Sequence, residues 1–362
     1  MAKPKYEKKD HRALLVEKLI ESWSDNAVYT KPWIMTGERP YNPETGTQIR
    51  GMNLVSFMLN GYDDPRYYTF NGINAVRERL GLDYKDLHLE KGSEGFPIFK
   101  AVEVILNKEK WQKDKETGII VPSGGDETGS EKPAKIMTLA YCGTGFGVDQ
   151  IHGAEHLPRH VHREVNPIPE LEKVMEAMKR DGLTYKFMDI DQAYYRPDTD
   201  TVCCPHPDRF KSDMLMARTV LHETGHATGH AKRLNRETIQ NYNGSTEVRA
   251  EEELIAEFTS YFTGIDTGIG YDRTQHDNHS AYTRIWAERL GEDKHALFRA
   301  VGRAEKATKY IGGKVLELEK ELGLHKEQEP AKEAKILLPE GVDNIKRLPL
   351  SRNKEPDMQM SM

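Results

Sequence analysis

The second half of the chain has the hydrophobic periodicity of α-helices. Apolar residues recur three and four positions apart within residues 211–228, 246–263, 281–290 and 294–320, which places them on one face of a helix in each segment. A further helix is predicted over residues 170–182, where the pattern ends at a glycine, a common helix-terminating residue. The pattern therefore predicts a mainly helical C-terminal half.

The first half mixes helices with short strands. An amphipathic helix is predicted over residues 11–23, and a second helix over residues 54–60. Short apolar runs predict strands at residues 66–70, 96–106 and 134–142. This mixture predicts a small α+β domain.

A change in composition divides the chain into two domains. Residues 150–170, rich in histidine and proline, have no clear periodicity and are interpreted as the connection. Beyond it, residues 193–205 predict two strands joined by a turn. After the last helix no periodicity remains. The sequence therefore predicts an α+β protein with domains at residues 1–150 and 165–322, followed by a flexible tail at residues 323–362.

Composition and charge narrow the class of protein. Of the 362 residues, 37% are hydrophobic and 30% are charged. The sequence contains no run of about 18 apolar residues, the length that a membrane-spanning helix needs, so no membrane span is predicted. The net charge of −6 argues against a nucleic-acid-binding protein built on one large basic face. Three cysteines make no disulfide framework and the N-terminus does not resemble a signal peptide, so a cytoplasmic protein is expected.

The segment TVLHETGHATGH at residues 219–230 contains the strongest chemical signal in the chain. His222 and His226 are four residues apart, so on a helix their imidazoles lie on one face and can bind one metal ion. Glu223 lies about 100° further round the axis, beside the ion, where it can accept a proton from water. This HExxH spacing predicts a Zn²⁺ site with Glu223 as general base, although Mn²⁺ or another divalent ion could use the same ligands.

The third ligand does not follow from this motif alone. A histidine six residues after His226 would complete one known pattern, but that position is Lys232. His230 is closer, yet Gly225 and Gly229 predict that the helix ends before it. We therefore expect His230 to cap or line the site rather than to bind the ion.

A carboxylate from the helix predicted at residues 246–264 is the better candidate. Projected around a helix axis, Glu253 and Glu257 share a stripe beside the apolar face, flanked by small residues that permit close approach to the metal helix. Glu253 is therefore the expected third ligand, and Glu257 is expected to orient a histidine. Glu251 also projects near the apolar face and remains an alternative, whereas Glu252 is expected to point into solvent.

Several long blocks of sequence form a pattern that extends over residues 10–315. The blocks in the first half are KPW (31–33), RPYNPETGTQIRGMN (39–53), DPRYYTF (64–70) and EKGSEGFPIFK (90–100). Those in the second half are AYYRPDTDTVCCPHPDRF (193–210), LHETGHATGHAKRLNR (221–236), AEEELIAEF (250–258) and residues 279–311. In this order the blocks resemble the ArdC family of antirestriction proteins from plasmids and other mobile elements. Segments 108–135 and 141–153 depart from the family pattern.

The resemblance implies an N-terminal domain that binds single-stranded DNA, followed by a zincin-like metallopeptidase domain. It maps the metal ligands onto His222 and His226 and the catalytic acid/base onto Glu223, and it favours Glu253 over Glu251. Proteins that bind single strands combine cations for phosphates with aromatic rings for bases, although on residue type alone most of these rings fit a core better. The predicted DNA-contacting residues are Lys31, Trp33, Arg39, Tyr41, Arg50, Asn53 and Arg66.

The predicted function is that of an antirestriction-type protein of a mobile element. It would bind single-stranded DNA and hydrolyse an unidentified protein or peptide in the cytoplasm of a bacterium. One alternative is a DNA-binding shield whose metal is structural, and another is a peptidase whose first domain recognises protein. Three ligands with Glu223 in the base position favour a catalytic site, because a structural zinc site is usually closed by four protein ligands.

Overall fold

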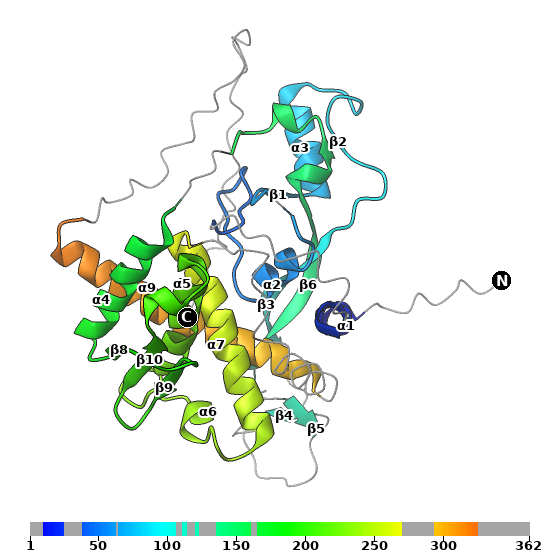
Figure 1. Cartoon of the computed structure of the whole chain (residues 1–362). Helices are drawn as coiled ribbons and strands as arrows, with labels where there is room; N and C mark the ends of the chain where they lie inside the picture. Colours follow the sequence, from blue (N-terminus) through cyan, green and yellow to red (C-terminus); the bar gives the residue numbers. More distant parts are fainter. Residues whose placement is uncertain are drawn as a thin grey trace, which may run out of the picture. The chain divides into compact units, whose positions relative to one another are not determined.

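A three-stranded antiparallel sheet organises the N-terminal half of the protein (Figure 1). The computed structural model describes residues 10–24, 38–62, 64–105, 111–113, 120–122, 135–160, 165–269 and 293–324. The sheet has the order β1–β6–β3 and consists of β1 (Tyr67–Thr69), β6 (Lys135–Gly147) and β3 (Phe96–Ile105). The long pair β3–β6 shifts register between Ile98 and Phe99. Helix α2 (Met52–Met58) packs against β3.

Two further helices and two short strand pairs complete this half. The helices are α1 (His11–Ser24) and α3 (Phe70–Leu80). The pairs are β2 (His88–Leu89) with β7 (Ile151–His152), and β4 (Trp111–Lys113) with β5 (Ile120–Pro122), and two single turns are η1 (Val148–Gln150) and η2 (Ala154–His156). Helix α3 begins after Thr69, whose hydroxyl accepts a hydrogen bond from the Gly72 amide, and ends at Gly81 in the left-handed conformation. Both ends follow the usual capping chemistry.

The C-terminal half packs helices against a second three-stranded sheet. Strand β10 (Thr201–Pro205) lies in the middle, parallel to β8 (Thr184–Met188) and antiparallel to β9 (Tyr194–Arg196). The helices are α4 (Pro167–Arg180), α5 (Asp213–Ala227), α6 (Glu237–Gln240), α7 (Thr246–Thr267) and α9 (Lys294–Glu321), with one turn of 3₁₀ helix, η3 (Pro207–Arg209). Helix α5 contacts β9 and β10 on one side and α7 on another, so it is the central element of this half.

One hydrophobic core is shared by the two halves. It contains Leu15 from α1 and Leu54 from α2, together with Phe258 and Phe262 from α7 and Leu297 from α9. Full burial of such a side chain contributes about 1.5–3 kcal/mol. An isolated N-terminal half would therefore expose apolar side chains that the C-terminal helices cover in the whole chain.

A second core holds the metal helix in place. Val220 and Leu221 of α5 pack with Leu171 of α4, Val202 of β10 and Ile311 of α9. All five side chains are fully or almost fully buried. One side of α5 is thereby fixed, and its opposite side is free to present polar groups.

The predicted α+β class is confirmed, with differences at the ends of elements. Strand β6 continues to Gly147, five residues beyond the predicted end. A Cβ at Gly145 would lie 2.4 Å from the ring of Phe96, so this part of the strand requires glycine. Glycine weakens the sequence signal for a strand, which explains the difference. The helix predicted at residues 281–290 lies outside the described residues, as does nearly all of the predicted tail.

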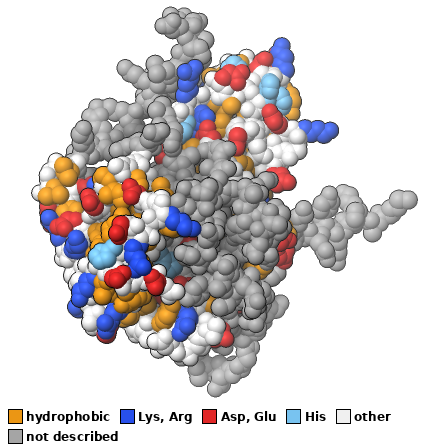
Figure 2. Space-filling model, viewed as in Figure 1, with side chains coloured by type: hydrophobic (Ala, Val, Ile, Leu, Met, Phe, Trp, Pro, Cys, Tyr) orange, Lys and Arg blue, Asp and Glu red, His pale blue; other side chains and the backbone are white. Residues whose placement is uncertain are grey.

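Surface charge is mixed on the face shown in Figure 2. Lysine and arginine side chains of the described residues are interspersed there with aspartate and glutamate, rather than gathered in one basic area. This agrees with the net charge of −6. None of the described helices is both long and apolar enough to cross a membrane.

Candidate metal centre

Helix α5 presents the HExxH motif to a pocket. The helix begins after Ser212, whose hydroxyl accepts a hydrogen bond from the Leu215 amide. It packs closely on α7 at Gly225, where a Cβ would lie 3.1 Å from backbone atoms of Ala256. This glycine, inside the motif, lets the two helices approach closely enough to share a site.

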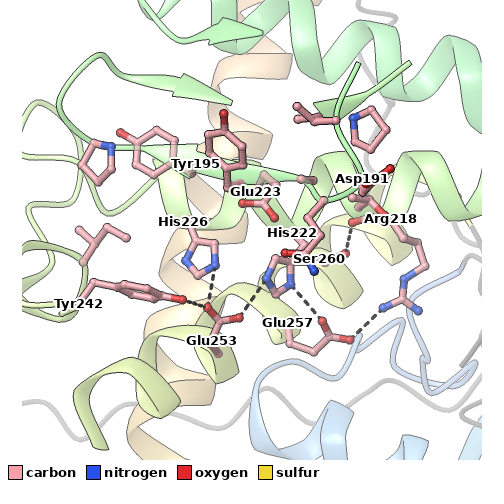
Figure 3. A pocket seen from close by; sticks show the side chains of 18 of the residues that line it. Asp191, Tyr195, Arg218, His222, Glu223, His226, Tyr242, Glu253, Glu257 and Ser260 are labelled. Atoms are coloured by element: carbon pink, nitrogen blue, oxygen red, sulfur yellow. Dashed lines mark hydrogen bonds and ion pairs between the residues drawn. The ribbon is translucent and has the colours of Figure 1, made fainter. Parts of the chain in front are cut away.

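The structure brings His222, His226 and Glu253 together. The Nε2 atom of His222 lies 3.4 Å from Oε2 of Glu253, and Nε2 of His226 lies 3.6 Å from Oε1 of the same carboxylate (Figure 3). One ligand atom from each residue lies within 4.8 Å of the others. Two imidazoles and a carboxylate around one point form a donor set that suits zinc or another divalent ion.

The other nitrogen of each imidazole contacts a second carboxylate. The Nδ1 atom of His222 lies 3.1 Å from Oε2 of Glu257, and Nδ1 of His226 lies 3.1 Å from Oε1 of Glu252. A carboxylate in this position fixes the tautomer, so that Nε2 carries the lone pair that binds the ion. The geometry therefore has an inner set of ligands and an outer set of groups that orient them.

The expectation that Glu252 points into solvent is wrong. Glu252 is completely buried and accepts hydrogen bonds from the guanidinium of Arg236 and the hydroxyl of Thr238. Burial alone would raise the pKa of Glu252, but Arg236 and His226 outweigh it and hold the pKa well below its usual value. The helical projection failed because these partners come from a separate segment.

The structure also separates the other two alternatives from the pocket. Glu251 pairs with Arg303 and Arg299 on α9, away from the histidines. His230 follows the end of α5, where its Nδ1 accepts a hydrogen bond from the Lys232 amide. His230 is not among the residues that line the pocket, so its predicted place next to the metal centre is not observed.

Glu223 lies on the opposite side of the imidazoles from Glu253, next to Tyr195 of β9 (Figure 3). It lines a pocket of about 1370 Å³ whose walls come from β9, α5, α7 and residues 239–244. Burial raises the pKa of Glu223, although His222 and His226 oppose this effect. A raised pKa suits a general base that must release its proton again near neutral pH.

The electrostatics of the inner set are those of a cation site. Burial would lower the pKa of His222, but Glu253 and Glu257 outweigh it and raise the pKa well above the usual value. Burial would raise the pKa of Glu253, but His222 and His226 outweigh burial and lower this pKa. The carboxylates therefore stabilise positive charge at the point where the three ligand atoms meet.

Four residues around the centre were not identified from the sequence. They are Tyr242, which donates a hydrogen bond to Glu253, Arg218, which donates to Glu257, and the pair Arg236 and Thr238. Of these four, only Arg218 could have been found from the sequence, because it lies one helical turn before His222 on the same face of α5. The other three lie in loops or in the short helix α6.

The predicted DNA-contacting arginines differ in exposure. Arg39 is 5% exposed, and its Nε lies 2.6 Å from Oδ1 of Asp266 at the end of α7. Its guanidinium is thus used inside the fold and is not exposed for the predicted phosphate contact. Arg50 has a side chain that is 44% exposed and pairs with Glu305 at 3.3 Å. Of these two arginines, Arg50 therefore has the exposed side chain that a phosphate contact would need.

The remaining predicted DNA-contacting residues have structural partners or are not described. Asn53 exchanges two hydrogen bonds with the backbone of Phe99. Arg66 donates to Asp64 and to the Pro158 carbonyl, and the partly exposed Tyr41 contacts His160. Among the neighbouring aromatic residues of this half, Tyr67 and Tyr68 are buried in cores, whereas Phe70 is exposed. Lys31 and Trp33 lie outside the described residues.

Two solved structures with the same fold are those of an antirestriction protein from a plasmid. The metal-free structure of the antirestriction ArdC protein from the R388 plasmid is 24% identical and has a TM-score of 0.59, covering 85% of this chain and 99% of that one. The Mn(II)-bound structure is 25% identical with a TM-score of 0.57, covering 85% and 98%. Together with the grouped ligands His222, His226 and Glu253, this likeness supports a divalent metal ion.

Sequence relatives cover the same region. DNA primase TraC of Escherichia coli is 31% identical over 316 residues, which are 84% of this chain and 27% of TraC, so the chain spans about a quarter of that relative. An uncharacterized protein of Sinorhizobium fredii, y4eC, is 24% identical over 290 residues, or 78% of this chain and 85% of that protein.

Two family models divide the chain near the predicted boundary. The model for the N-terminal domain of the anti-restriction factor ArdC matches residues 9–146, and the model for a zincin-like metallopeptidase matches residues 170–303. The two histidines and the four carboxylates of the centre, Glu223, Glu252, Glu253 and Glu257, fall within the second match. The chain therefore combines two matched regions, one like the N-terminal domain of ArdC and one zincin-like domain that contains the candidate metal centre.

Proposed function

We propose that this chain is an antirestriction-type protein that binds single-stranded DNA and carries a catalytic zinc peptidase site. The observation that carries the proposal is the position of Glu223, buried beside three converging ligand atoms and facing a large pocket. Each of these features is required of a metal-dependent hydrolase, whereas a purely structural site needs neither the base nor the pocket.

The residues of the centre would divide the chemistry among them. His222, His226 and Glu253 would hold the ion, which when bound lowers the pKa of a water molecule to about 7. Glu223 would take the proton of the attacking water and return it to the amine that leaves. Tyr242, through its hydrogen bond to Glu253, holds that carboxylate in place. Glu252 and Glu257 keep both imidazoles in the tautomer that exposes Nε2.

The number of ligands supports catalysis over a structural role. Among the described residues, the group able to hold an ion contains three side chains, so a fourth position is left for water or substrate. A structural site would close that position with a fourth protein ligand. The alternative of a DNA-binding shield with a structural metal therefore has less support.

The experiment that tests the proposed peptidase uses the full chain, stripped of metal and reloaded with Zn²⁺. Unfolded proteins and peptide libraries are incubated with it, with and without single-stranded DNA, and products are read by mass spectrometry. We expect cleavage that requires the ion and stops when a chelator removes it. Tight metal binding with no cleavage in any condition would support the structural-metal alternative instead.

Arg50 and Arg39 give a matched pair for the DNA-binding half of the proposal. In the full chain, Arg50→Ala is expected to weaken binding to a single-stranded oligonucleotide and to reduce the slope of log K against log salt by about 0.7, since one phosphate contact is lost. Arg39→Ala should instead lower the free energy of unfolding by roughly 1–3 kcal/mol, because Asp266 loses the nearer of its two arginine partners. Fluorescence anisotropy at several salt concentrations, with thermal melting, separates the two effects. Equal loss of affinity in both variants would contradict the assignment.

A further inference from the structure

Each histidine of the candidate metal centre contacts a carboxylate that in turn contacts an arginine. On one side, Arg218 Nη2 lies 3.2 Å from Oε1 of Glu257, whose Oε2 lies 3.1 Å from Nδ1 of His222. On the other, Arg236 Nη2 lies 2.5 Å from Oε1 of Glu252, and that same oxygen lies 3.1 Å from Nδ1 of His226. The centre thus contains two arginine–carboxylate–histidine chains.

The two arginines complete the charge balance of the centre. Glu223, Glu252, Glu253 and Glu257 are each at most 8% exposed, so their charges receive little compensation from water. With neutral imidazoles, a divalent ion neutralises half of these four negative charges, and two guanidinium groups neutralise the other half. Without Arg218, Glu257 next to His222 would lose one of the groups that compensate its buried charge.

The two arginine–carboxylate–histidine chains differ in their surroundings. Arg236 is buried and also donates to the carbonyl of Gly225 and the hydroxyl of Thr228, so it joins the end of α5 to the rest of the fold. Arg218 lines the pocket, and its guanidinium lies over the ring of Tyr261 at 4.0 Å. Figure 3 shows it reaching Glu257 from the side opposite His222. A change at Arg218 is therefore less disruptive to folding than one at Arg236.

We infer that Arg218 is a positioning residue for the metal centre, acting on the ion through Glu257 and His222. The inference rests on the proposed metal site. Its Nη2 holds one oxygen of Glu257, while the other oxygen is directed at Nδ1 of His222, so that Nε2 of His222 faces the ion. Lysine at this position would keep the charge but not the planar guanidinium that lies over Tyr261.

The test measures metal affinity and coordination rather than catalysis. Full-length chains are stripped of metal, and Zn²⁺ affinity is measured by competition with a chromophoric chelator, while the Co²⁺ absorption spectrum reports ligand geometry. Arg218→Met, which keeps much of the side-chain stem, is expected to lose about 10- to 100-fold in Zn²⁺ affinity and to alter the Co²⁺ spectrum. Arg218→Lys should lose less. Glu257→Gln combined with Arg218→Met should lose little more than Glu257→Gln alone, because both act through His222.

Arg209→Met is the matched control. Arg209 also lines the pocket, but it pairs with Asp189 and Asp191 and reaches neither histidine, so its Zn²⁺ affinity should equal that of the unmodified chain. A lower melting temperature of metal-free Arg218→Met with unchanged affinity and spectrum would show a merely structural role and overturn the inference. If Arg218→Met does not fold, an unchanged Zn²⁺ affinity together with an unchanged Co²⁺ spectrum in Arg218→Lys would overturn the inference as well. Failure of the unmodified chain to take up metal would overturn the proposed metal site itself, and this inference with it.

Discussion

Replacement of Glu253 by alanine is expected to remove tight Zn²⁺ binding from the full chain. Among the residues that the structure describes, Glu253 is the carboxylate whose two oxygens face both imidazoles, at 3.4 and 3.6 Å from their Nε2 atoms. Loss of a group that only orients a ligand costs roughly 10- to 100-fold in affinity, so loss of the ligand itself should cost more than that. Chelator competition on the metal-stripped chain gives the affinity directly.

Glu251→Ala provides the matched comparison, because Glu251 lies on the same helix two residues away. Its partners are Arg299 and Arg303 of α9, so its removal should leave Zn²⁺ affinity unchanged and lower only the melting temperature, by a small amount. Loss of metal from the Glu251 variant with retention by the Glu253 variant would show that the wrong carboxylate has been assigned. Metal bound equally by both variants would place the third ligand elsewhere in the chain.

The part of the centre that could be predicted from sequence is the part that is local. His222, Glu223 and His226 lie within one and a half turns of a helix, and helical geometry alone fixes their relative directions. Glu253 comes from another helix, and its selection over Glu251 needed the family resemblance as well as the projection. The structure adds that Gly225 permits the close packing that brings Glu253 to the histidines.

The part that could not be predicted depends on contacts between distant segments. Glu252 was expected in solvent because a helical projection contains no information on what packs against that face. Arg236 and Thr238, which approach from the loop after α5 and from α6, convert an expected surface charge into a buried and fully partnered one. The same reason applies to Arg39, whose partner Asp266 is 227 residues away.

The two predicted domains are not physically independent of each other. Residues 9–146 and 170–303 match separate family models, yet α1 and α2 share a core with α7 and α9. Helix α7 carries Glu253 and Glu257, and Arg39 and Arg50 both pair with Asp266 near its C-terminal end. Both halves therefore contribute to holding one helix, and DNA-binding and metal-binding experiments are best made on the whole chain.

Glu223→Gln is expected to keep the metal and the fold but to lose hydrolysis. Glutamine has nearly the shape of glutamate, but its amide cannot take a proton from water. Glu223 is not among the three ligands, so Zn²⁺ affinity and the Co²⁺ spectrum should change little. Removal of a general base typically lowers the rate by about 100- to 10,000-fold. The measurement is the rate of Zn²⁺-dependent cleavage of the best peptide found for the unmodified chain.

Two comparisons make this result specific to the base. Glu251→Gln changes a carboxylate of α7 that does not line the pocket, so its cleavage rate should match that of the unmodified chain. Glu223→Asp keeps a carboxylate but withdraws it by one methylene, so an intermediate rate is expected. Binding of single-stranded DNA should be the same in all these chains, because Glu223 lies in the zincin-like domain and not in the ArdC N-terminal domain. Full cleavage by a metal-loaded Glu223→Gln chain would exclude Glu223 as the base and leave the ion's own hydroxide, without a protein base, as the source of the activity.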